Sequence, residues 1–533
     1  MGEESSKTWQ APSSVVADPE GDTLYTLCAR SRRLLAVSEG AVRWSLMLEG
    51  EPTGLAAASE SPLLWVTCAG SEGIVEAIDS QTGKRVARWP AGYGACSPVI
   101  GPETHRLYVL NRFDGEVQAF ALDAGKELER IRVGREPIAA ALTPDEQLLV
   151  VANLLPNGRS DLRFVACDIA IVDTQTLSVR TNISLVNGGV LARGVAVSPD
   201  GRWAAGTHNL ARFQVPTAQA EHGWLNDSAL ALIDLTTFQL RATLLLDEPQ
   251  KGAANPAAVA WTEAGRRLII AHSGTHELSV IEIQAVLDRV LATKPGHFVS
   301  DLAFLKDTRK RIPLRGNGAR SLAVRGGSVW VAGYFSDMIE VVFLDGEEPG
   351  RLIALGGGAE RTVTGLGERL FNDATIGHRS WQSCASCHPD GRVDGLNWDL
   401  LNDGIGNAKN TKSLLLSHRT PPAMSLGVRG TAEKAVRSGL RNILFARRNE
   451  AQAQAIDEYL KSLEPAPNPN LVHGQLSAAA DRGRKLFESP EVGCAQCHPG
   501  PLFTDMMAYA VGTEQRPKRR ELEFDTPTLV ESW

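Results

Sequence analysis

The sequence predicts a multidomain protein of the β-plus-α class, in which an N-terminal seven-bladed β-propeller precedes two small all-α domains. Two observations lead to this expectation. The chain has 533 residues and a mass of 57.3 kDa, which is too much for one hydrophobic core. Its first two-thirds repeat a unit of strands and turns, whereas near Gly356 strand alternation gives way to helical spacing of apolar residues. The expected domains are 1–357, 358–466 and 467–533.

The repeated unit consists of an apolar strand, a turn rich in Gly, Asn, Asp and Ser, a second apolar strand and a polar turn. It is seen on comparing PLLWVTCAGSEGIVEAIDSQTGK, from Pro62, with RLYVLNRFDGEVQAFALDAGK, from Arg106. This alternation indicates antiparallel strands. A repeat of about 40–50 residues with about four strands is typical of a propeller blade, and about seven fit between Ala11 and Gly358. The units resemble the YVTN-type bacterial propeller repeats more than WD40 repeats.

Two of the units are stretched by insertions, at 154–173 and at 207–235. Long insertions leave a propeller as loops on one face, and such loops commonly contact something. In the last third of the chain, helical spacing is seen over 429–463 and 476–490. The segment between these two regions, EPAPNPNLVHG, is rich in proline and typical of a linker.

Composition and charge exclude some functions. The net charge is −7 and the pI is about 6.0, whereas nucleic-acid-binding proteins present a basic face. The sequence has no apolar run long enough for a membrane-spanning helix. Its N-terminus, MGEESSKTWQAPSS, lacks the basic-then-apolar order of a secretory signal. We therefore expect no nucleic-acid partner and no transmembrane segment in this chain.

The eight cysteines are of two kinds. Four lie in strand-like apolar runs and are expected to be buried free thiols, although a disulfide between two of them stays open at this point. These four are Cys28, Cys68, Cys96 and Cys167. The other four form two C-x-x-C-H motifs of identical spacing, which read CASCH from Cys384 and CAQCH from Cys494.

Three kinds of site use paired cysteines in this way. Two pairs of thiolates can surround one zinc ion, but structural zinc sites draw their pairs from a few tens of residues, and these pairs lie on either side of the linker. A thioredoxin-like redox pair needs a strand-to-helix turn in an α/β pattern, which this sequence does not show. Covalent attachment of haem is the usual meaning of C-x-x-C-H.

Haem attachment accounts for each position of the motif. Cysteines three apart on a helical turn face the same side, so both reach the vinyl groups of one porphyrin, and the next histidine becomes the proximal iron ligand. A proline follows each histidine and ends the short helix. We therefore expect two c-type haems. The attachment residues are Cys384, Cys387, Cys494 and Cys497, and the proximal ligands are His388 and His498.

A longer pattern surrounds both motifs. Each follows a G-x-x-LF segment, GERLFNDATIG from Gly367 and GRKLFESPEVG from Gly483, and the second is followed by FDTPTL from Phe524. This arrangement resembles the dihaem cytochrome c peroxidase and MauG superfamily, over residues 365–533. With the propeller in front, the chain is also similar to two-part propeller–dihaem proteins of bacterial genomes. The resemblance implies two cytochrome c domains, one haem that activates peroxide or oxygen, and one that relays electrons from a donor.

Two departures limit what the resemblance implies. Superfamily members usually place a distal histidine and a Trp-Asp-Gly-Arg run after the first haem. The matching segment here, 403–436, has no histidine in its DGIGN stretch and keeps only Gly427-Val428-Arg429. Members also continue past Thr-Pro-Thr-Leu into a Tyr-x-His-Asp-Gly region, whereas this sequence stops at Trp533. We expect it to be truncated at both ends, lacking an export leader and part of the last domain.

The sequence leaves the sixth ligand of each iron open. For the first haem the candidates are Met424, in TPPAMSLG, and His418, in SHRTPP. A methionine opposite histidine gives a higher-potential electron-transfer haem. For the second haem they are Met506 and Met507, or a residue beyond the last one of this sequence.

An open first iron would allow peroxide to coordinate there. Cleavage of the O–O bond then needs a proton shuttle and a positive group nearby, for which Glu433 and Arg429 are the candidates. A solvated ion pair at the start of a helix explains these two residues equally well.

The leading hypothesis is an extracytoplasmic, periplasmic dihaem c-type cytochrome, an oxidoreductase of the dihaem-peroxidase type. A soluble electron donor or acceptor protein would exchange electrons with it, and peroxide or a protein would be its substrate. The alternative is a non-catalytic electron-transfer or docking cytochrome whose propeller binds a partner protein.

A third hypothesis, a quinoprotein-like centre in the propeller, is weaker because the propeller histidines show no metal or cofactor spacing. These are His208, His222, His272 and His276. His208 and Arg212 are instead candidates to cover the haem domain. A calcium ion is compatible with the sequence, but no pattern indicates one.

Overall fold

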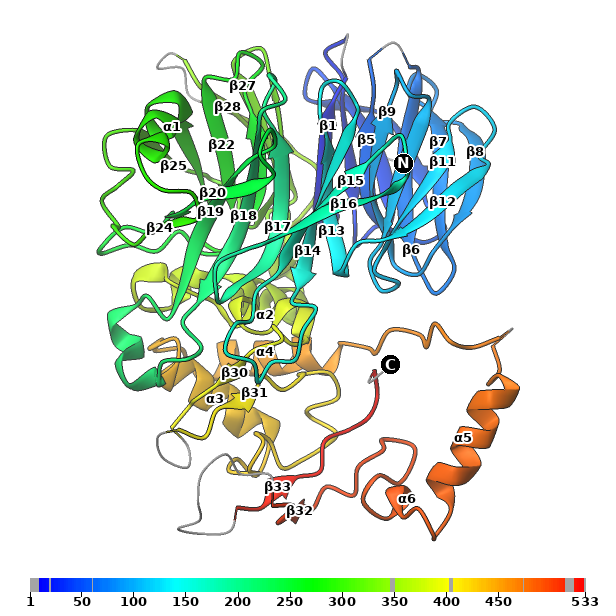
Figure 1. Cartoon of the computed structure of the whole chain (residues 1–533), viewed down its shortest axis with the longest axis vertical. Coiled ribbons are helices and arrows are strands. Elements are labelled where there is room, and N and C mark those ends of the chain that lie inside the picture. The colour runs from blue at the N-terminus through cyan, green and yellow to red at the C-terminus, as the bar shows by residue number, and fades with distance from the viewer. Residues whose placement is uncertain are drawn as a thin grey trace.

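The computed structural model describes residues 9–18, 21–59, 61–345, 350–401, 406–472, 474–512 and 522–531. It confirms the seven-bladed β-propeller, whose blades are sheets of four antiparallel strands, consecutive in every blade but blade 6 and extended by one strand in blade 5. Figure 1 shows helices α2 (Val363–Asn372), α3 (Ala432–Asn442) and α4 (Glu450–Lys461) against one end of the propeller. Helices α5 (Ala478–Glu488) and α6 (Cys494–Cys497) lie apart from them.

The strands follow one another around the ring in chain order. Blades 1 and 2 contain β1 (Pro12–Ala17), β2 (Leu24–Cys28), β3 (Arg33–Ser38), β4 (Ala41–Met47), β5 (Glu51–Ala57), β6 (Leu63–Ala69), β7 (Gly73–Asp79) and β8 (Arg85–Ala91). Blades 3 and 4 contain β9 (Ala95–Gly101), β10 (Arg106–Asn111), β11 (Glu116–Ala121), β12 (Glu127–Arg132), β13 (Arg135–Leu142), β14 (Leu148–Leu155), β15 (Asp168–Asp173) and β16 (Ser178–Ser184). Blade 5 contains β17 (Gly189–Val197), β18 (Trp203–Ala211), β19 (Asn226–Asp234), β20 (Gln239–Leu245) and β24 (His297–Val299). Blades 6 and 7 contain β21 (Pro256–Trp261), β22 (Arg267–His272), β23 (Glu277–Glu282), β25 (Arg309–Pro313), β26 (Ala319–Arg325), β27 (Ser328–Gly333), β28 (Met338–Phe343) and β29 (Arg351–Ala354).

A recurrent aspartate fixes the turn between the third and fourth strands of a blade. Asp79 Oδ1 accepts a hydrogen bond from the backbone N–H of Thr82 at 2.7 Å, and Asp173 Oδ1 accepts one from Thr176 at 2.9 Å. An aspartate that binds the backbone a few residues on mimics a backbone turn. This local chemistry is why the strands and turns could be predicted from the repeats.

The ring closes between blades 1 and 7. Val15 and Leu24 of blade 1 share an apolar cluster with Ala332 and Ile339 of blade 7. Asp337 is fully buried, and its carboxylate accepts backbone hydrogen bonds from residues 10 and 11 at 2.9 and 2.8 Å and from residue 358 at 2.9 Å. One carboxylate therefore joins the chain where it enters the propeller to the chain where it leaves.

Blade 6 departs from the simple repeat. Helix α1 (Ile283–Leu291) follows β23 and buries Ile283, Val286, Leu287 and Val290. Strand β24 then adds to blade 5, parallel to β20, before β25 completes blade 6. The extra helix therefore covers a cluster shared by blades 5 and 6.

The part after the propeller is less helical than predicted. Helices α2, α3, α4 and α5 each begin at a side chain that accepts a backbone hydrogen bond, and these caps are Thr362, Thr431, Asn449 and Ser477. Between them run long irregular segments, turns and two short strand pairs. The pairs are β30 (Asn397–Trp398) with β31 (Lys409–Asn410), and β32 (Ala508–Tyr509) with β33 (Phe524–Asp525). Over the described residues the helical content is therefore small and two all-α domains are not shown, because glycines and prolines interrupt the helical pattern between 389 and 431.

The two G-x-x-LF helices have different surroundings. In α2, a Cβ added at Gly367 would lie 1.9 Å from the backbone oxygen of Ala455, so only glycine allows α4 to approach this closely. In α5, a Cβ at Gly483 would meet nothing within 4 Å. The same sequence motif thus forms a tight helix pair in the first unit and an uncovered helix in the second.

The last described residues, 522–531, contact both helical units. Asp525 N donates to Ser425 O at 2.9 Å, and Arg392 binds Glu531 through two nitrogens at 2.8 and 3.0 Å. Thr526 N donates to Met507 O at 2.9 Å. The segment containing FDTPTL therefore connects residues on both sides of the expected boundary at 467.

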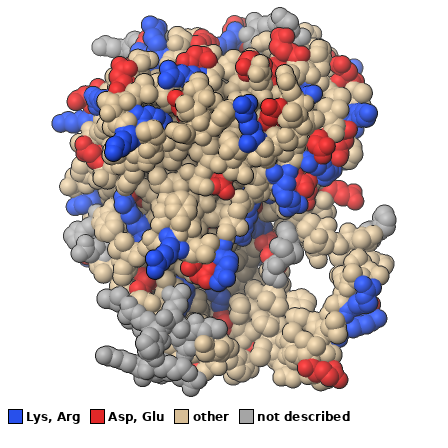
Figure 2. Space-filling view, in the orientation of Figure 1, with Lys and Arg blue, Asp and Glu red and all other residues tan. Residues whose placement is uncertain are grey.

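The described helices include none that is long and apolar enough to cross a membrane. On the face drawn in Figure 2, acidic and basic side chains are interspersed over the propeller.

Candidate functional site

The two C-x-x-C-H motifs fold into the same turn. The first forms the 3-10 turn η6 (Cys384–Ser386), and the second forms α6. In both, the histidine N–H donates to the carbonyl of the first cysteine, at 2.9 Å for His388 and 3.0 Å for His498. The backbone angles also match, with φ −117° and ψ 67° at His388 and φ −117° and ψ 57° at His498. The backbone around the histidine is thus alike in the two turns.

Each histidine ring is held through its Nδ1 atom. His388 Nδ1 lies 3.3 Å from Arg392 O, and His498 Nδ1 lies 2.9 Å from Phe503 O. Burial lowers the pKa of His388 to about 4, while the backbone carbonyls of Arg392 and Lys412 act in the opposite direction, so the ring is neutral at pH 7. A neutral histidine that donates from Nδ1 to a carbonyl offers Nε2 as a metal ligand.

The four motif thiols are free and belong to separate environments. Cys384 packs against the cluster of α2 and α4, and Cys387 packs against a cluster of propeller blades 4 and 5. Burial raises the pKa of Cys384 to about 12 and raises that of Cys387 above its usual range, whereas redox-active thiols have lowered values. Among the described residues, no group of three or more His, Cys, Asp and Glu side chains is arranged to hold one ion.

This geometry fits covalently attached haem better than zinc or a redox dithiol. The thiols are unpaired, the imidazoles are oriented by carbonyls, and the arrangement occurs twice. Either motif supplies the two attachment atoms and the one nitrogen ligand that a c-type haem requires.

The first motif lies between the helices and the propeller. Asn226, at the start of β19, donates from Nδ2 to Ser386 O at 3.0 Å and lies 3.6 Å from Cys387 Sγ. Asn255, just before β21, donates to Ser383 Oγ at 2.8 Å and accepts from Ser386 Oγ at 2.7 Å. All five residues except Cys387 are buried. The propeller therefore forms one wall of this site.

Both insertions predicted from the sequence contact the same region. In the first, Ser160 Oγ accepts a hydrogen bond from Asn410 Nδ2 at 2.8 Å. In the second, Thr217 N donates to Asp399 O at 3.2 Å, and Gly223 lies against the ring of Trp381. Trp398 packs into the cluster of blades 4 and 5, with its Nε1 donating to Asp394.

A charged cluster follows the first histidine. Asp390 lies 2.8 Å from Arg112, which also binds Glu136 at 2.8 Å. Burial alone would raise the pKa of Asp390, but Arg112 and then Arg193 lower it below its usual range. The carboxylate is therefore ionised, and it joins the end of the motif to blades 3 and 4.

The second motif is much more exposed than the first. Helix α5 has no buried residue, and Leu486, Val492 and Met507 are 61%, 54% and 58% exposed. The ring of Phe487 contacts that of Phe503 at 6.1 Å between centroids. The unit around His498 thus presents an apolar surface.

The two candidates for the sixth ligand of the first haem iron lie in different surroundings. Met424 has a positive φ of 75° in a loop where Ala423 pairs with Arg429. His418 is 4% exposed, and its Nε2 lies 3.2 Å from Asp457 Oδ1. Asp457 also binds Arg437, so His418 belongs to a network that joins the 411–429 segment to α3 and α4.

The other candidates have their own partners. Arg429 Nη2 donates to Ser438 Oγ at 3.2 Å, and Glu433 sits in the first turn of α3, where its own backbone N–H and Thr431 lower its pKa. Within the described residues these two side chains form no ion pair with each other. Met506 and Met507 lie in the loop after His498 and are 36% and 58% exposed.

The structure also places the remaining residues singled out from the sequence. His208 is buried in β18 with Nδ1 2.9 Å from Asn209 O, and Arg212 binds Asp227. His272 is held by Ala253 O and Ser279 Oγ, while His276 Nε2 lies 3.3 Å from Asp373 and joins the propeller to the end of α2.

The four cysteines outside the motifs are buried and free, as predicted. The side chain of His222 and residues 403–405 of the 403–436 segment lie outside the described residues.

Sequence reasoning missed Asn226 and Asn255. Their one signal is a difference between the motifs, because Ser383 and Ser386 of the first are replaced by Gly493 and Gln496 in the second. Only the first pair of residues can make the contacts described above.

Comparisons with known proteins relate the chain to one enzyme. No family model matches it. It is 36% identical over 166 residues to hydrazine synthase subunit gamma of Kuenenia stuttgartiensis, covering 28% of this chain and 47% of that protein. It is 24% identical over 215 residues to subunit beta of the same organism, covering 39% of this chain and 53% of that protein. The chain therefore spans about half the length of each.

A solved structure of Kuenenia stuttgartiensis hydrazine synthase shares the fold, with a TM-score of 0.57 and 20% identity over 64% of this chain and 98% of that chain. The chain is thus homologous to two subunits of hydrazine synthase, and its propeller fold is shared with that enzyme.

Proposed function

We propose that this chain is a dihaem c-type cytochrome that carries electrons as a subunit of a multi-subunit haem oxidoreductase. The observation that carries the proposal is the repeated turn, in which two free thiols precede a histidine whose Nδ1 contacts a backbone carbonyl. Its similarity to the gamma and beta subunits of hydrazine synthase supports a redox role in a complex.

In this proposal each motif defines a cytochrome c unit. The first consists of η6 with α2, α3 and α4, and the second consists of α6 with α5 and the 522–531 segment. A c-type haem supplies one-electron chemistry at its iron. The chain supplies two thiols for attachment and one imidazole nitrogen, and the apolar cluster around Leu370, Phe371 and Tyr459 excludes water from the first site.

The two sites differ in how accessible they are, and this difference indicates which haem exchanges electrons with partner proteins. The first motif is enclosed by the propeller and the helices, whereas the second is surrounded by exposed apolar side chains. We therefore assign the second unit as the place where a soluble donor, acceptor or further subunit docks. Covalent haem attachment also implies an extracytoplasmic, periplasmic location.

A second candidate function is peroxide reduction at the first haem, with Glu433 and Arg429 assisting. One observation disfavours it. Within the described residues the side chains of Glu433 and Arg429 form no ion pair, and Arg429 Nη2 donates to Ser438 Oγ at 3.2 Å, so the two are not arranged as a pair for one ligand. We therefore favour electron transfer to a partner over peroxidase chemistry within this chain.

The test is expression of the full chain with a haem-attachment system, followed by denaturation and extraction with acidified solvent. Two haems per chain should stay with the protein, and the Cys384→Ser/Cys387→Ser and Cys494→Ser/Cys497→Ser double variants should each retain one. Release of the colour into the solvent would refute the proposal. Rapid turnover of hydrogen peroxide with a reduced donor would instead favour the peroxidase function.

A further inference from the structure

We infer that the propeller is part of the first haem site, with Asn226 and Asn255 as positioning residues that fix the 383–387 turn and the surroundings of the Cys387 sulfur. This inference rests on the proposed function. It assigns the propeller a role in tuning one haem.

Asn255 holds the turn at both of its ends. Its Nδ2 donates to Ser383 Oγ at 2.8 Å, and its Oδ1 accepts from Ser386 Oγ at 2.7 Å. Ser386 Oγ also accepts from Ser383 N at 3.0 Å, so the two serines and the asparagine form a closed network. Because Asn255 is 8% exposed and both serines are nearly inaccessible, water cannot replace these hydrogen bonds.

Asn226 contacts Cys387, the second cysteine of the motif. Its Nδ2 donates to Ser386 O at 3.0 Å and lies 3.6 Å from Cys387 Sγ, with Asn226 itself 2% exposed. A buried amide beside a sulfur that carries haem is one of the contacts that tune the potential of the iron.

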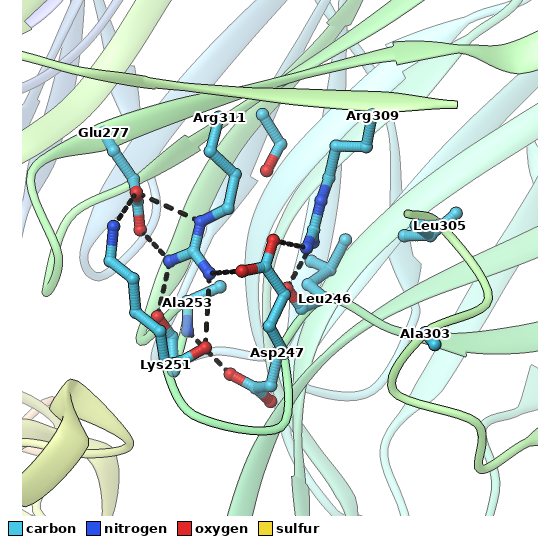
Figure 3. Close-up of polar contacts among 12 residues, drawn as sticks. Leu246, Asp247, Lys251, Ala253, Glu277, Ala303, Leu305, Arg309 and Arg311 are labelled. Carbon is cyan, nitrogen blue, oxygen red and sulfur yellow. Dashed lines mark hydrogen bonds and ion pairs between the residues drawn. The ribbon is translucent and has the colours of Figure 1, made fainter. Parts of the chain in front are cut away.

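The loop 247–254, which leads to Asn255, is fixed by polar contacts with charged side chains, of which Glu277, Arg311 and Asp247 are buried. Figure 3 shows Arg311 and Lys251 pointing toward Glu277. Arg311 also binds Gly252 O at 2.5 Å, and Ala253 N donates to Asp247 Oδ1 at 2.7 Å. On its other side the loop meets the motif region, because Gly252 N donates to Arg379 O at 2.8 Å. The loop before Asn255 is therefore rigid where it contacts the chain leading into the turn.

The second motif provides an internal comparison. The two motifs share Cys-Ala-x-Cys-His, but Gly493 and Gln496 stand where the first has Ser383 and Ser386. Gly493 has no side chain, and the longer side chain of Gln496 cannot take the place that the Ser386 hydroxyl has between Ser383 and Asn255. The sequence difference therefore matches the structural one, in which only the first turn is bound by the propeller.

Removal of the amide beside Cys387 should destabilise the reduced state of the first haem, because an N–H donor beside the sulfur favours the less charged, reduced iron and leucine supplies no such donor. We expect Asn226→Leu and Asn255→Leu to shift the midpoint potential of the first haem to lower values and to leave the second unchanged. The Cys494→Ser/Cys497→Ser variant, which holds only the first haem, assigns the two transitions.

Asn153→Leu is the matched control. Asn153 is also fully buried, and its Nδ2 donates to two backbone carbonyls, those of Val133 at 3.1 Å and Asp168 at 2.9 Å. The Asn153→Leu variant loses the same kind of hydrogen bonds within the propeller, and we expect it to leave the midpoint potentials of both haems unchanged. Potentiometric titration of the full-length holoproteins, followed by optical spectra, gives the readout.

The outcomes separate the inference from the proposed function. If the wild type holds two covalent haems but the variants shift neither potential, or shift both equally, the inference fails and the proposed function stands. If the wild type holds no covalent haem, both fail. Should the asparagine variants not fold, Ser386→Gln copies the second motif without altering the propeller, and an unchanged first potential in that variant also overturns the inference.

Discussion

The carboxylate of Asp390 lies 2.8 Å from the guanidinium of Arg112 and so joins the residue two positions after His388 to blade 3 of the propeller. It is one of several polar contacts across this boundary, with Arg30 binding Glu368 and His276 lying 3.3 Å from Asp373. Together these contacts fix the first helical unit on the propeller.

Arg112→Gln tests how much this contact contributes. The variant leaves Asp390 and Glu136 without the guanidinium, and because Arg112 is only 16% exposed we expect a loss of about 2 kcal/mol in the free energy of unfolding. Arg132→Gln removes a pair with Glu116 in which Arg132 is 78% exposed, and it should cost well under about 1 kcal/mol. Denaturant unfolding of both variants measures the difference, and equal effects would contradict the assignment of Arg112 as a docking residue.

Gly367→Ala and Gly483→Ala form a second matched pair. The first places a Cβ 1.9 Å from Ala455 O and should separate α2 from α4, at a cost of about 3 kcal/mol. The second meets nothing within 4 Å and should stabilise α5 by about 1 kcal/mol, because alanine is the better helix former. Helical circular dichroism during thermal unfolding checks both, and a tolerated alanine at 367 would refute the close packing.

Glu277→Gln should change how stability depends on pH. Burial alone would raise the pKa of Glu277, but Arg311 lowers it to about 2, below its usual 4.5. A carboxylate with a depressed pKa stabilises the fold above pH 4.5, and this contribution, of about 3 kcal/mol, is lost as the pH falls from 4.5 to 2. The variant should be less stable than the wild type at pH 7, and the difference should shrink as the pH approaches 3.

The control for this titration lies on the same strand. Glu282 binds Arg267 at 2.7 Å but is 56% exposed, so Glu282→Gln should leave the pH profile nearly unchanged. Thermal unfolding midpoints from pH 7 to pH 3 provide the measurement. If the unfolding midpoints of the wild type and of Glu277→Gln change with pH in parallel, the carboxylate of Glu277 does not have this role.

His418→Ala distinguishes a structural histidine from an iron ligand. Its Nε2 contacts Asp457, which also binds Arg437, so the variant should lower the stability of the helical part by about 1–2 kcal/mol. We expect the optical and EPR spectra of the haem-loaded protein to stay unchanged. Met424→Leu in parallel tests the other candidate, and a spectral change in His418→Ala alone would assign the ligand to His418.

The propeller was predictable because its determinants are local. Strand alternation and turns such as the one fixed by Asp79 lie within a few residues of each other. Helix α1 was not predicted, since its apolar residues, such as Val286 and Leu287, serve the same propeller core as the strands around them. Two all-α domains in the last third are not shown by the structure, because sequence periodicity marked the helices but not the length of the irregular segments between them.

The two cysteine motifs could also be located in the sequence, since each is a contiguous pattern of residues. The residues that surround the first motif were not, because they come from far away in the chain. Asn226 precedes Ser386 by 160 positions, and Asn255 precedes it by 131. No local pattern reports such a pairing, and only the folded ring brings these side chains to the same place.

The enclosure of Ser383 and Ser386 by Asn255 bears on the order of maturation. If a haem is attached to Cys384 and Cys387, attachment is easier while the propeller and the helices are still apart, because the finished interface buries Ser383 and Ser386 beside these cysteines. The exposed turn at His498 imposes no such order. Under the proposed function, delivery of the first cofactor before the ring and the helices meet would therefore favour maturation of this chain.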